Sequence, residues 1–394
     1  MKICLAPTWL LALPRFGGNI WVYMNWALGL QANGLDVVWL ERLPRRVVQG
    51  ESSGRAFEEL TLPETLERID TLQARFSAVG LRSQVTLVMT DDERARFLPL
   101  RDELQHRTLP FEQAVAESDL LLSLNYSLDS DIVRRFRRSA LVDIDPGFLQ
   151  NWIVERQINV AEYDRYFTIG ETVGRRGALF PDCGLSWEYT PPAVFLPAWP
   201  ASPSDAAAAY TTVSGWWIGW DKWRGEIVDN RKRTAFMRFA DLPSRTSVPL
   251  ELALDLGEDR TGEASYLETH GWKVRDAAEV SASPDQYRKY VQQSRGEFSC
   301  AKTSYVHLRT AWISDRTLCY LASGKPAVVE HTGPSRFLPD SEGLFRFDNL
   351  KDAARCLGRA EADYERQCRL ARTLAEEFFD AARVTKRVLE KAVE

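Results

Sequence analysis

The chain lacks several features that would assign it to familiar functional classes. Its 50 lysine and arginine residues are outnumbered by 55 aspartate and glutamate residues, and a net charge of −5 argues against an extended nucleic-acid surface. No apolar run approaches the roughly 20 residues that span a bilayer. There is no P-loop, no GxSxG nucleophile motif and no HExxH zinc motif. The composition therefore predicts a soluble globular protein.

Cysteine and histidine are scarce and scattered. The six cysteines form no CxxC pair and show no metal-ligand spacing, so we expect free thiols in a reducing cytoplasm. The four histidines fit no Ser-His-Asp or Cys-His order. Residues 1–13 are apolar, but Pro7 interrupts this stretch and Pro14 follows it, and there is no small-residue cleavage site. These features favour a first buried strand over a signal peptide. We expect a cytoplasmic protein.

Length and patterning indicate two α/β domains. A chain of 394 residues is long enough for two cores, and short apolar runs alternate with helical patterns. Such alternation implies a parallel sheet covered on both faces. The strands predicted in the first half are 3–6, 37–40, 85–89, 120–124, 140–144 and 166–169. Those predicted in the second half are 211–217, 250–254, 297–300, 327–329 and 344–347.

The best linker is the stretch 191–204, PPAVFLPAWPASPS, because repeated prolines disfavour both helix and sheet. We therefore predict a first Rossmann-like domain over 1–195 and a second over 205–370. Residues 371–394 read as a helix that either packs back on the first domain or caps the surface.

The most informative segment is 312–332, WISDRTLCYLASGKPAVVEHT. Ser314 is a good helix N-cap, and Asp315 in the first turn suits the positive end of the helix dipole. Gly324 allows a left-handed end, and Pro326 stops the helix before a short strand. A helix N-terminus at the mouth of an α/β sheet is a suitable site for phosphate.

A second candidate loop is Phe16-Gly17-Gly18-Asn19, between the first strand and the first helix. Adjacent glycines let a backbone approach a ligand, and the helix that follows favours an anion. With Glu41 ending the second strand, dinucleotide binding must be considered, but the third glycine of GxGxxG is missing. A structural turn and a substrate-facing loop are the other interpretations.

Asp143-Ile144-Asp145 has the form of a DxD motif that holds a divalent metal. Pro146-Gly147 follows directly, and aspartates at a strand end also form turns, so we favour the interpretation without metal. Either aspartate is still a candidate for the lining of a cleft.

Cationic and hydroxyl residues gather near the predicted strand ends of the second domain, where a diphosphate leaving group would need positive charge. They are Lys222, Lys232, Arg238, Arg245, Lys302, Thr303, Ser304, Arg309, Ser314 and Arg316. Thirteen tryptophans include a cluster in 215–223, GWWIGWDKW, which suits either a binding wall for sugar or base, or the packing of a domain interface.

Together these motifs resemble those of GT-B glycosyltransferases. Residues 322–328, ASGKPAV, match the "A-S/C-G-x-P-V-V" pattern of the donor-binding half of those enzymes, and 342–345 and 378–380 resemble later parts of it. The Gly17-Gly18 loop matches their glycine loop at the interdomain cleft. The Glu-x7-Glu signature of the commonest retaining group is absent here, and Ser314-Asp315-Arg316 occupies that region.

The resemblance implies two Rossmann-like domains facing across a cleft and transfer of a sugar from a nucleotide-diphosphate donor to a hydroxyl. The donor is expected on the second domain, against Lys302, Ser314, Asp315 and Arg316. The acceptor is expected near Gly17, Gly18 and Asp145 of the first domain. Arg316 or Lys232 would neutralise the departing diphosphate, Asp145 would serve as base if the enzyme inverts, and no metal or other cofactor is expected.

Three rivals stay open. An isomerase of the nucleotide-sugar 2-epimerase kind would use the same scaffold with several cleft carboxylates. A non-catalytic homologue would bind the nucleotide sugar without turnover. A metal-dependent transferase would act through Asp143 and Asp145.

Overall fold

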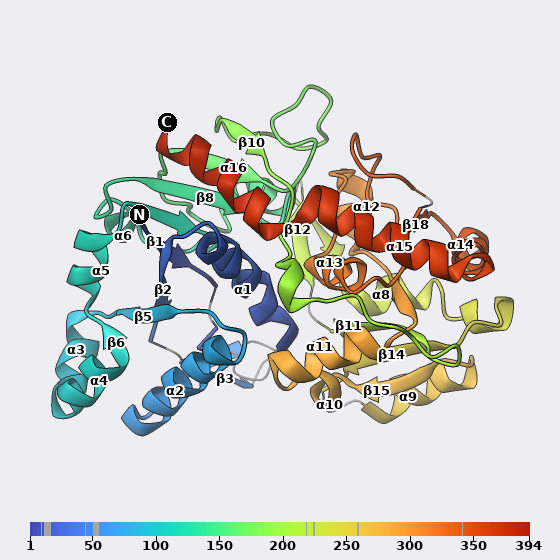
Figure 1. Cartoon of the computed structure of the whole chain (residues 1–394), viewed down its shortest axis with the longest axis horizontal. Helices are drawn as coiled ribbons and strands as arrows, with labels where there is room; N and C mark the ends of the chain where they lie inside the picture. The colour runs from blue at the N-terminus through green and yellow to red at the C-terminus, as the bar shows by residue number, and fades with distance from the viewer. Residues whose placement is uncertain are drawn as a thin grey trace.

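Two separate parallel sheets form the framework of the computed structural model, which describes residues 1–8, 10–11, 17–43, 45–49, 55–217, 219–223, 225–257, 260–340 and 342–394 (Figure 1). The strands of the first sheet, in spatial order, are β10 (Trp187–Tyr189), β9 (Arg165–Thr168), β8 (Ser139–Asp143), β7 (Leu120–Ser123), β1 (Lys2–Ala6), β2 (Asp36–Arg42), β5 (Ser83–Val88) and β6 (Thr108–Leu109). Those of the second are β15 (Lys273–Asp276), β14 (Leu250–Asp255), β11 (Tyr210–Gly215), β16 (Gly296–Ser299), β17 (Ala327–Glu330) and β18 (Leu344–Phe347). The predicted α/β class is confirmed.

Helices connect the strands of each sheet. In the first domain they are α1 (Gly17–Ala32), α2 (Leu62–Ala78), α3 (Asp91–Phe97), α4 (Arg101–Arg107), α5 (Phe111–Glu117), α6 (Ser130–Val133) and α7 (Phe148–Val154), with a 3-10 turn η1 (Leu98–Leu100). Later in the chain they are α8 (Lys232–Met237), α9 (Arg260–Thr269), α10 (Ala277–Ser281), α11 (Pro284–Gln293), α12 (Thr303–Leu308), α13 (Asp315–Ala322), α14 (Leu350–Ala362), α15 (Tyr364–Leu374) and α16 (Ala381–Val393). The remaining turns are η2 (Leu196–Ala198), η3 (Leu242–Arg245) and the π-helical η4 (Ala375–Phe379).

Burial on β1 shows why the first sheet is covered on both faces. Ile3 and Leu5 pack into a core that includes α1, whereas Cys4 and Ala6 point into a second core on the other face. A parallel strand buried on both sides reads as a continuous apolar run, which is how the sequence predicted it. The α1 core continues across the domain boundary to residues of α13 such as Leu318 and Leu321.

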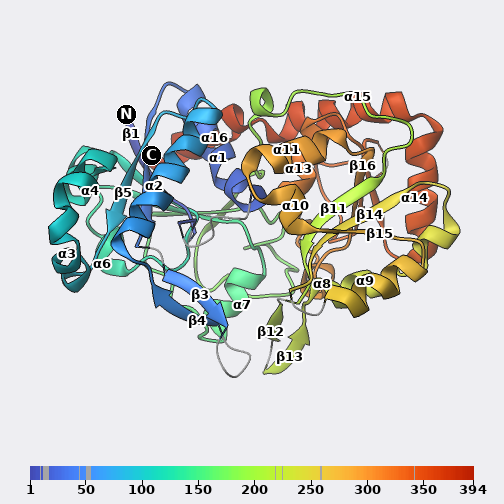
Figure 2. The same ribbon diagram turned by 90° about the horizontal axis from the view of Figure 1, so that it is seen from below.

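Two antiparallel hairpins stand outside the sheets and were not predicted. One is β3 (Arg45–Gln49) with β4 (Arg55–Glu59), and the other is β12 (Trp220–Trp223) with β13 (Glu226–Asp229). The second hairpin lies beside α7 of the first domain (Figure 2). There the Asn151 side chain donates to the carbonyl of Lys222 at 2.6 Å.

The chain crosses between the domains twice, and the two crossings bond to one another. The amide of Val194, in the outgoing segment, donates to the carbonyl of Phe379 at 2.8 Å, and the amide of Ala381 donates back to the carbonyl of Val194 at 2.9 Å. Helix α16 then packs on α1, where a side chain added to Gly29 would lie 2.6 Å from the carbonyl oxygen of Ala381. Figure 1 shows α15 and α16 running from the second domain onto the first.

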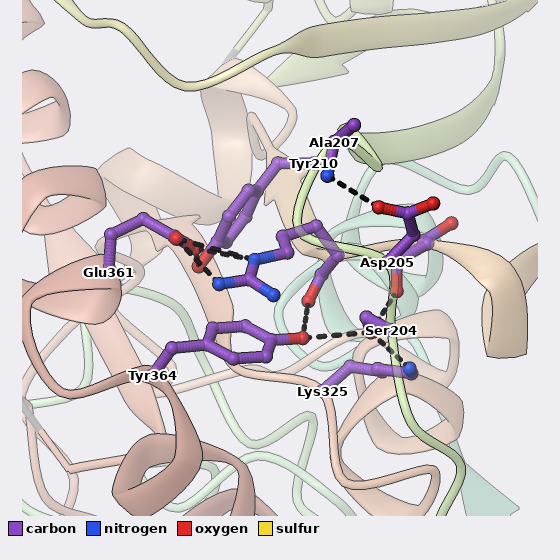
Figure 3. A network of polar contacts seen from close by, with 9 residues as sticks. Ser204, Asp205, Ala207, Tyr210, Lys325, Glu361 and Tyr364 are labelled. Carbon is purple, nitrogen blue, oxygen red and sulfur yellow. Dashed lines mark hydrogen bonds and ion pairs between the residues drawn. The ribbon is translucent and has the colours of Figure 1, made fainter.

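After this joint, the linker is fastened to the second domain by a buried polar network (Figure 3). The ammonium of Lys325, which is fully buried, donates to the carbonyls of Ser202 and Pro203 at 2.8 and 3.2 Å and also contacts the Ser204 hydroxyl. Beside it the Tyr364 hydroxyl contacts Ser204 Oγ at 2.8 Å. Lys325 of the GKP break therefore holds the linker.

The composition led to expectations about membrane-spanning segments and about the cysteines. None of the helices in the described ranges is long and apolar enough to cross a membrane. All six cysteines are free thiols, as predicted.

The anchoring role of Lys325 predicts a stability loss. In Lys325→Met, the aliphatic stem is kept but the linker carbonyls lose their donor, so we expect the free energy of unfolding to fall by about 2 kcal/mol in denaturant titrations. The matched control is Lys386→Met at an exposed position of α16, where a change within about 0.5 kcal/mol is expected. Equal effects of the two substitutions would contradict the role.

Candidate active site

The carboxyl edges of the two sheets face one another. In each sheet the strand order reverses next to the first strand, between β1 and β7 and between β11 and β16, and ligands of such folds bind at that point. A cavity of about 430 Å³ lies between the domains here. Its lining comes from α1, from the ends of β11, β14 and β15, from α10 and α11, and from the start of α13.

The start of α13 matches its prediction. Ser314 is the N-cap and its hydroxyl accepts from the amide of Arg316 at 3.3 Å, while Gly324 after the helix has a φ of 69°. Ser314, Asp315 and Arg316 all line the cavity. Burial raises the pKa of Asp315 to about 7, and the negative charge of Asp145 adds to the shift.

Arg316 sits at the switch point of the second sheet and is held by its strands. Its Nε donates to Glu297 at 2.8 Å, and its two terminal nitrogens donate to the carbonyl of Val213 at 2.9 Å and to the hydroxyl of Ser299 at 2.5 Å. These contacts join β11 to β16. Neutralisation of a leaving diphosphate by Arg316 stays a prediction. The structure adds a second role, in which the Arg316 side chain links β11 and β16 beside the cavity.

Lys232 and Lys302 lie on the same side of the cleft. Lys232 begins α8 and donates to the carbonyl of Cys300, and its pKa is lowered to about 7, mainly by burial and further by the charges of Arg316 and Lys302. Lys302 is the N-cap residue of α12, and its ammonium lies 5.2 Å from the ring centroid of Phe148 in the first domain. The structure therefore brings Lys232 near Arg316 and Lys302, although of these three cations only Arg316 lines the cavity.

The turn after β8 carries Asp145, and buried Asp143 builds that turn. One oxygen of Asp143 accepts from the amide of Asp145 at 2.9 Å, and the other accepts from Gln150 and Thr168 at 2.9 and 2.8 Å. Burial raises the pKa of Asp143 to about 7. Asp143 thus acts as a turn-former. Nowhere in the described ranges do three His, Cys, Asp or Glu side chains gather as a metal site would need.

Asp145 is contacted from both domains. Tyr305 of α12 donates to its Oδ1 at 2.8 Å, and Tyr126, in the loop after β7, donates to its Oδ2 at 3.2 Å. Neither tyrosine was predicted from the sequence. A usable signal was their position, because each follows a strand that borders a switch point.

The glycine loop lies at the domain contact. Gly18 lines the cavity, but a side chain on Gly17 would lie 2.2 Å from the carbonyl oxygen of Ser283, and one on Gly18 would lie 2.9 Å from the ring of Tyr287. The missing side chains of Gly17 and Gly18 therefore let α1 pack closely against the second domain, and Gly18 also lines the cavity. Phe16 lies outside the described residues. Glu41 is buried, with its pKa raised to about 8 by burial, and accepts from the indole of Trp39 at 2.9 Å, an arrangement unlike a ribose contact.

The tryptophans of the 215–223 cluster pack either inside the second domain or at its contact with the first. Trp216 is fully buried in the second domain, and the indole of Trp217 donates to the carbonyl of Leu256 at 2.9 Å. Trp223 packs against a cluster formed by Val173 and Phe180 of the first domain and Leu308 of the second. Packing explains these three side chains, and none of them lines the cavity. Ile218 lies outside the described residues.

Solved structures with the same arrangement span the whole chain. HepE of Anabaena in complex with UDP-glucose is 10% identical over 100% of this chain and 99% of HepE, with a TM-score of 0.55. AviGT4, a glycosyltransferase involved in avilamycin A biosynthesis, is 11% identical over 100% of this chain and 97% of its own, with a TM-score of 0.52. Both are GT-B glycosyltransferases.

The protein has the GT-B fold. Both the resemblance in the motif at 322–328 and the prediction of two Rossmann-like domains across a cleft are confirmed at this level. No family model matches the chain, and no curated protein sequence matches it. At such low identity the likeness establishes the GT-B fold alone.

The domain contact at Gly17 can be tested by substitution. Gly17→Ala would place a methyl group against the Ser283 backbone, so we expect the domains to separate, with a larger radius of gyration in small-angle X-ray scattering. Gly358→Ala, in α14 with open space around it, is the control and should leave the scattering unchanged. Identical scattering from both variants would show that the contact does not set the domain arrangement.

Proposed function

We propose that the protein is a glycosyltransferase that moves a sugar, expected to be a hexose, from a nucleotide-diphosphate sugar to an acceptor hydroxyl. The observation that carries the proposal is the interdomain cavity, where the start of α13 meets the carboxyl ends of the central strands of a GT-B fold. The likeness to HepE, solved with UDP-glucose, supports the choice of ligand. The free thiols agree with action in the cytoplasm.

The donor is assigned to the second domain. Nucleoside would occupy the part of the cavity formed by α10 and the ends of β14 and β15, and the diphosphate would meet the amides after Ser314. Lys232, Lys302 and Arg316 supply positive charge on that side, where charge develops as the diphosphate leaves. Cationic side chains in this place are the reason for proposing a reaction that needs no metal.

The acceptor is assigned to the first domain. The charge of Asp145 acts on the carboxyl group of Asp315, which lines the cavity, so Asp145 lies near the donor side although it is not itself part of the cavity lining. A carboxylate there is suited to take the proton of the attacking hydroxyl, which is the chemistry of an inverting enzyme. Asp145 is therefore proposed as the base.

The epimerase rival also has support from one observation. Asp315 lines the cavity and burial raises its pKa to about 7, and a proton-transfer reaction would use such a group. Product analysis with donor alone separates the two activities, because only an isomerase converts the donor without an acceptor. Binding without any turnover would indicate the non-catalytic homologue, and loss of transfer in EDTA would indicate the metal-dependent one.

Binding and transfer should separate in one variant. Calorimetry against UDP-, GDP- and dTDP-sugars should find at least one donor that binds, and Asp145→Asn should keep that binding. Transfer by Asp145→Asn should fall by about 10²- to 10⁴-fold, because the amide cannot accept the proton. If no donor in the panel binds, or if Asp145→Asn transfers sugar at the wild-type rate, the assignment is wrong.

Donor binding should take up a proton at Lys232. The free protein holds the pKa of Lys232 at about 7, below its ordinary value, so at pH 8.5 this amine is mostly neutral. A bound diphosphate favours the charged form and raises that pKa, so affinity should fall as the pH rises above 7. Calorimetry of nucleotide binding in two buffers of different ionisation enthalpy should show uptake at pH 8.5 and little at pH 6. Lys232→Met should abolish the uptake, and unchanged uptake in that variant would contradict the assignment.

A further inference from the structure

The carboxylate of Asp145 is oriented by hydroxyls from opposite sides of the cleft. Tyr305 reaches Oδ1 at 2.8 Å from the second domain, and Tyr126 reaches Oδ2 at 3.2 Å from the first. Hydrogen bonds to an ionised acceptor are among the stronger ones, and donors on both oxygens fix the plane of the group. The orientation of Asp145 therefore depends on the relative placement of the two domains.

Tyr305 has little freedom to turn away. Its side chain is nearly inaccessible to solvent, and its ring stacks on Trp312 with centroids 4.0 Å apart and planes 3° apart. The ring of Phe148 packs against it at an interplanar angle of 68°, with the two centroids 4.6 Å apart. At the start of the same helix, the amide of Ser304 donates to Asn230 at 2.9 Å. The hydroxyl of Tyr305 thus has a fixed place relative to the second domain.

The first domain presents its turn to α12 through a glycine. Gly147 has a φ of 85°, and a side chain there would lie 2.7 Å from the side chain of Leu308. The turn that carries Asp145 is therefore in direct contact with the helix that carries Tyr305. A separation of the domains at this contact breaks the Tyr305 hydrogen bond while Tyr126, which belongs to the same domain as Asp145, stays in place.

We propose that Tyr305 is a positioning residue that orients Asp145 toward the acceptor hydroxyl when the second domain is docked on the 143–147 turn. The inference rests on the proposed function, because it requires a step in which Asp145 takes a proton. In that step the acceptor oxygen bonds to the anomeric carbon and its proton passes to Asp145. The bond from that carbon to the diphosphate oxygen breaks, and the electron pair leaves with the nucleoside diphosphate.

Other titratable groups face Asp145 and belong to the setting in which it acts. They are Tyr23 of α1, Tyr126 and Asp143 of the first domain, and Tyr305, Asp315 and Asp221 of the second. Burial raises the pKa of each of these groups. The tyrosines therefore keep their protons near neutral pH, and the hydroxyls of Tyr126 and Tyr305 remain donors to Asp145.

The test compares Tyr305→Phe with Tyr290→Phe in the full chain. Tyr290 is a buried tyrosine of the same domain whose hydroxyl donates to Glu251 at 2.8 Å, so both variants lose one tyrosine–carboxylate hydrogen bond of equal length. Tyr305→Phe should lower the kcat of transfer by about 10- to 100-fold with the donor KM unchanged. Tyr290→Phe should change neither quantity.

A double variant tests whether Tyr305 acts through Asp145. In the Asp145→Asn background, adding Tyr305→Phe should produce no further loss of kcat, whereas independent roles would make the losses multiply. If wild type binds and transfers but Tyr305→Phe behaves as Tyr290→Phe does, or the losses multiply, the positioning role is wrong and the glycosyltransferase assignment stands. If wild type binds no donor nucleotide, the proposed function fails and takes the positioning role with it.

Discussion

The contacts that the two domains make with each other across the cleft depend on the joint at which the chain passes between them. Val194 and the residues around Asp380 bond to each other there, so the outgoing and returning segments act as one connection. Lys325 and its neighbours hold the linker beyond that connection, which leaves only a short stretch of chain to set the domain orientation. With this placement, the carboxyl edges of two separate sheets point at the same space.

The two domains bring opposite charges to that space. Asp145 comes from the first domain, while Lys232, Lys302 and Arg316 come from the second. Asp315 and Asp221 are exceptions, since each adds a carboxyl group to the second domain and has its pKa raised by burial and by the charge of Asp145. A sugar donor carries its negative charge on the diphosphate and its electrophilic carbon beside it. In the proposed reaction, this division would put the base near the carbon and the cations near the leaving group.

Local signals explain what the sequence predicted well. Ser314, Gly324 and Pro326 mark the start and end of α13 through their own backbone preferences, and the central strands read as buried apolar runs. Such local signals could not predict the contacts between residues that lie far apart in the sequence. Tyr305 meets Asp145 across 160 residues, and the guanidinium of Arg316 reaches both Val213 and Glu297 because β11 lies beside β16. Strand order decides these contacts, and apolar periodicity carries no information about strand order.

The packing of α16 on α1 orders events during synthesis. Gly29 fits against the backbone of Ala381, and Asn33 donates to the carbonyl of Ala382 at 2.8 Å, so the first domain is finished by residues that leave the ribosome after the whole second domain. Until then one side of α1 has no cover. The first domain therefore completes its fold only after α16 has been synthesised. The folding of the two domains is coupled in this way, although each has its own sheet.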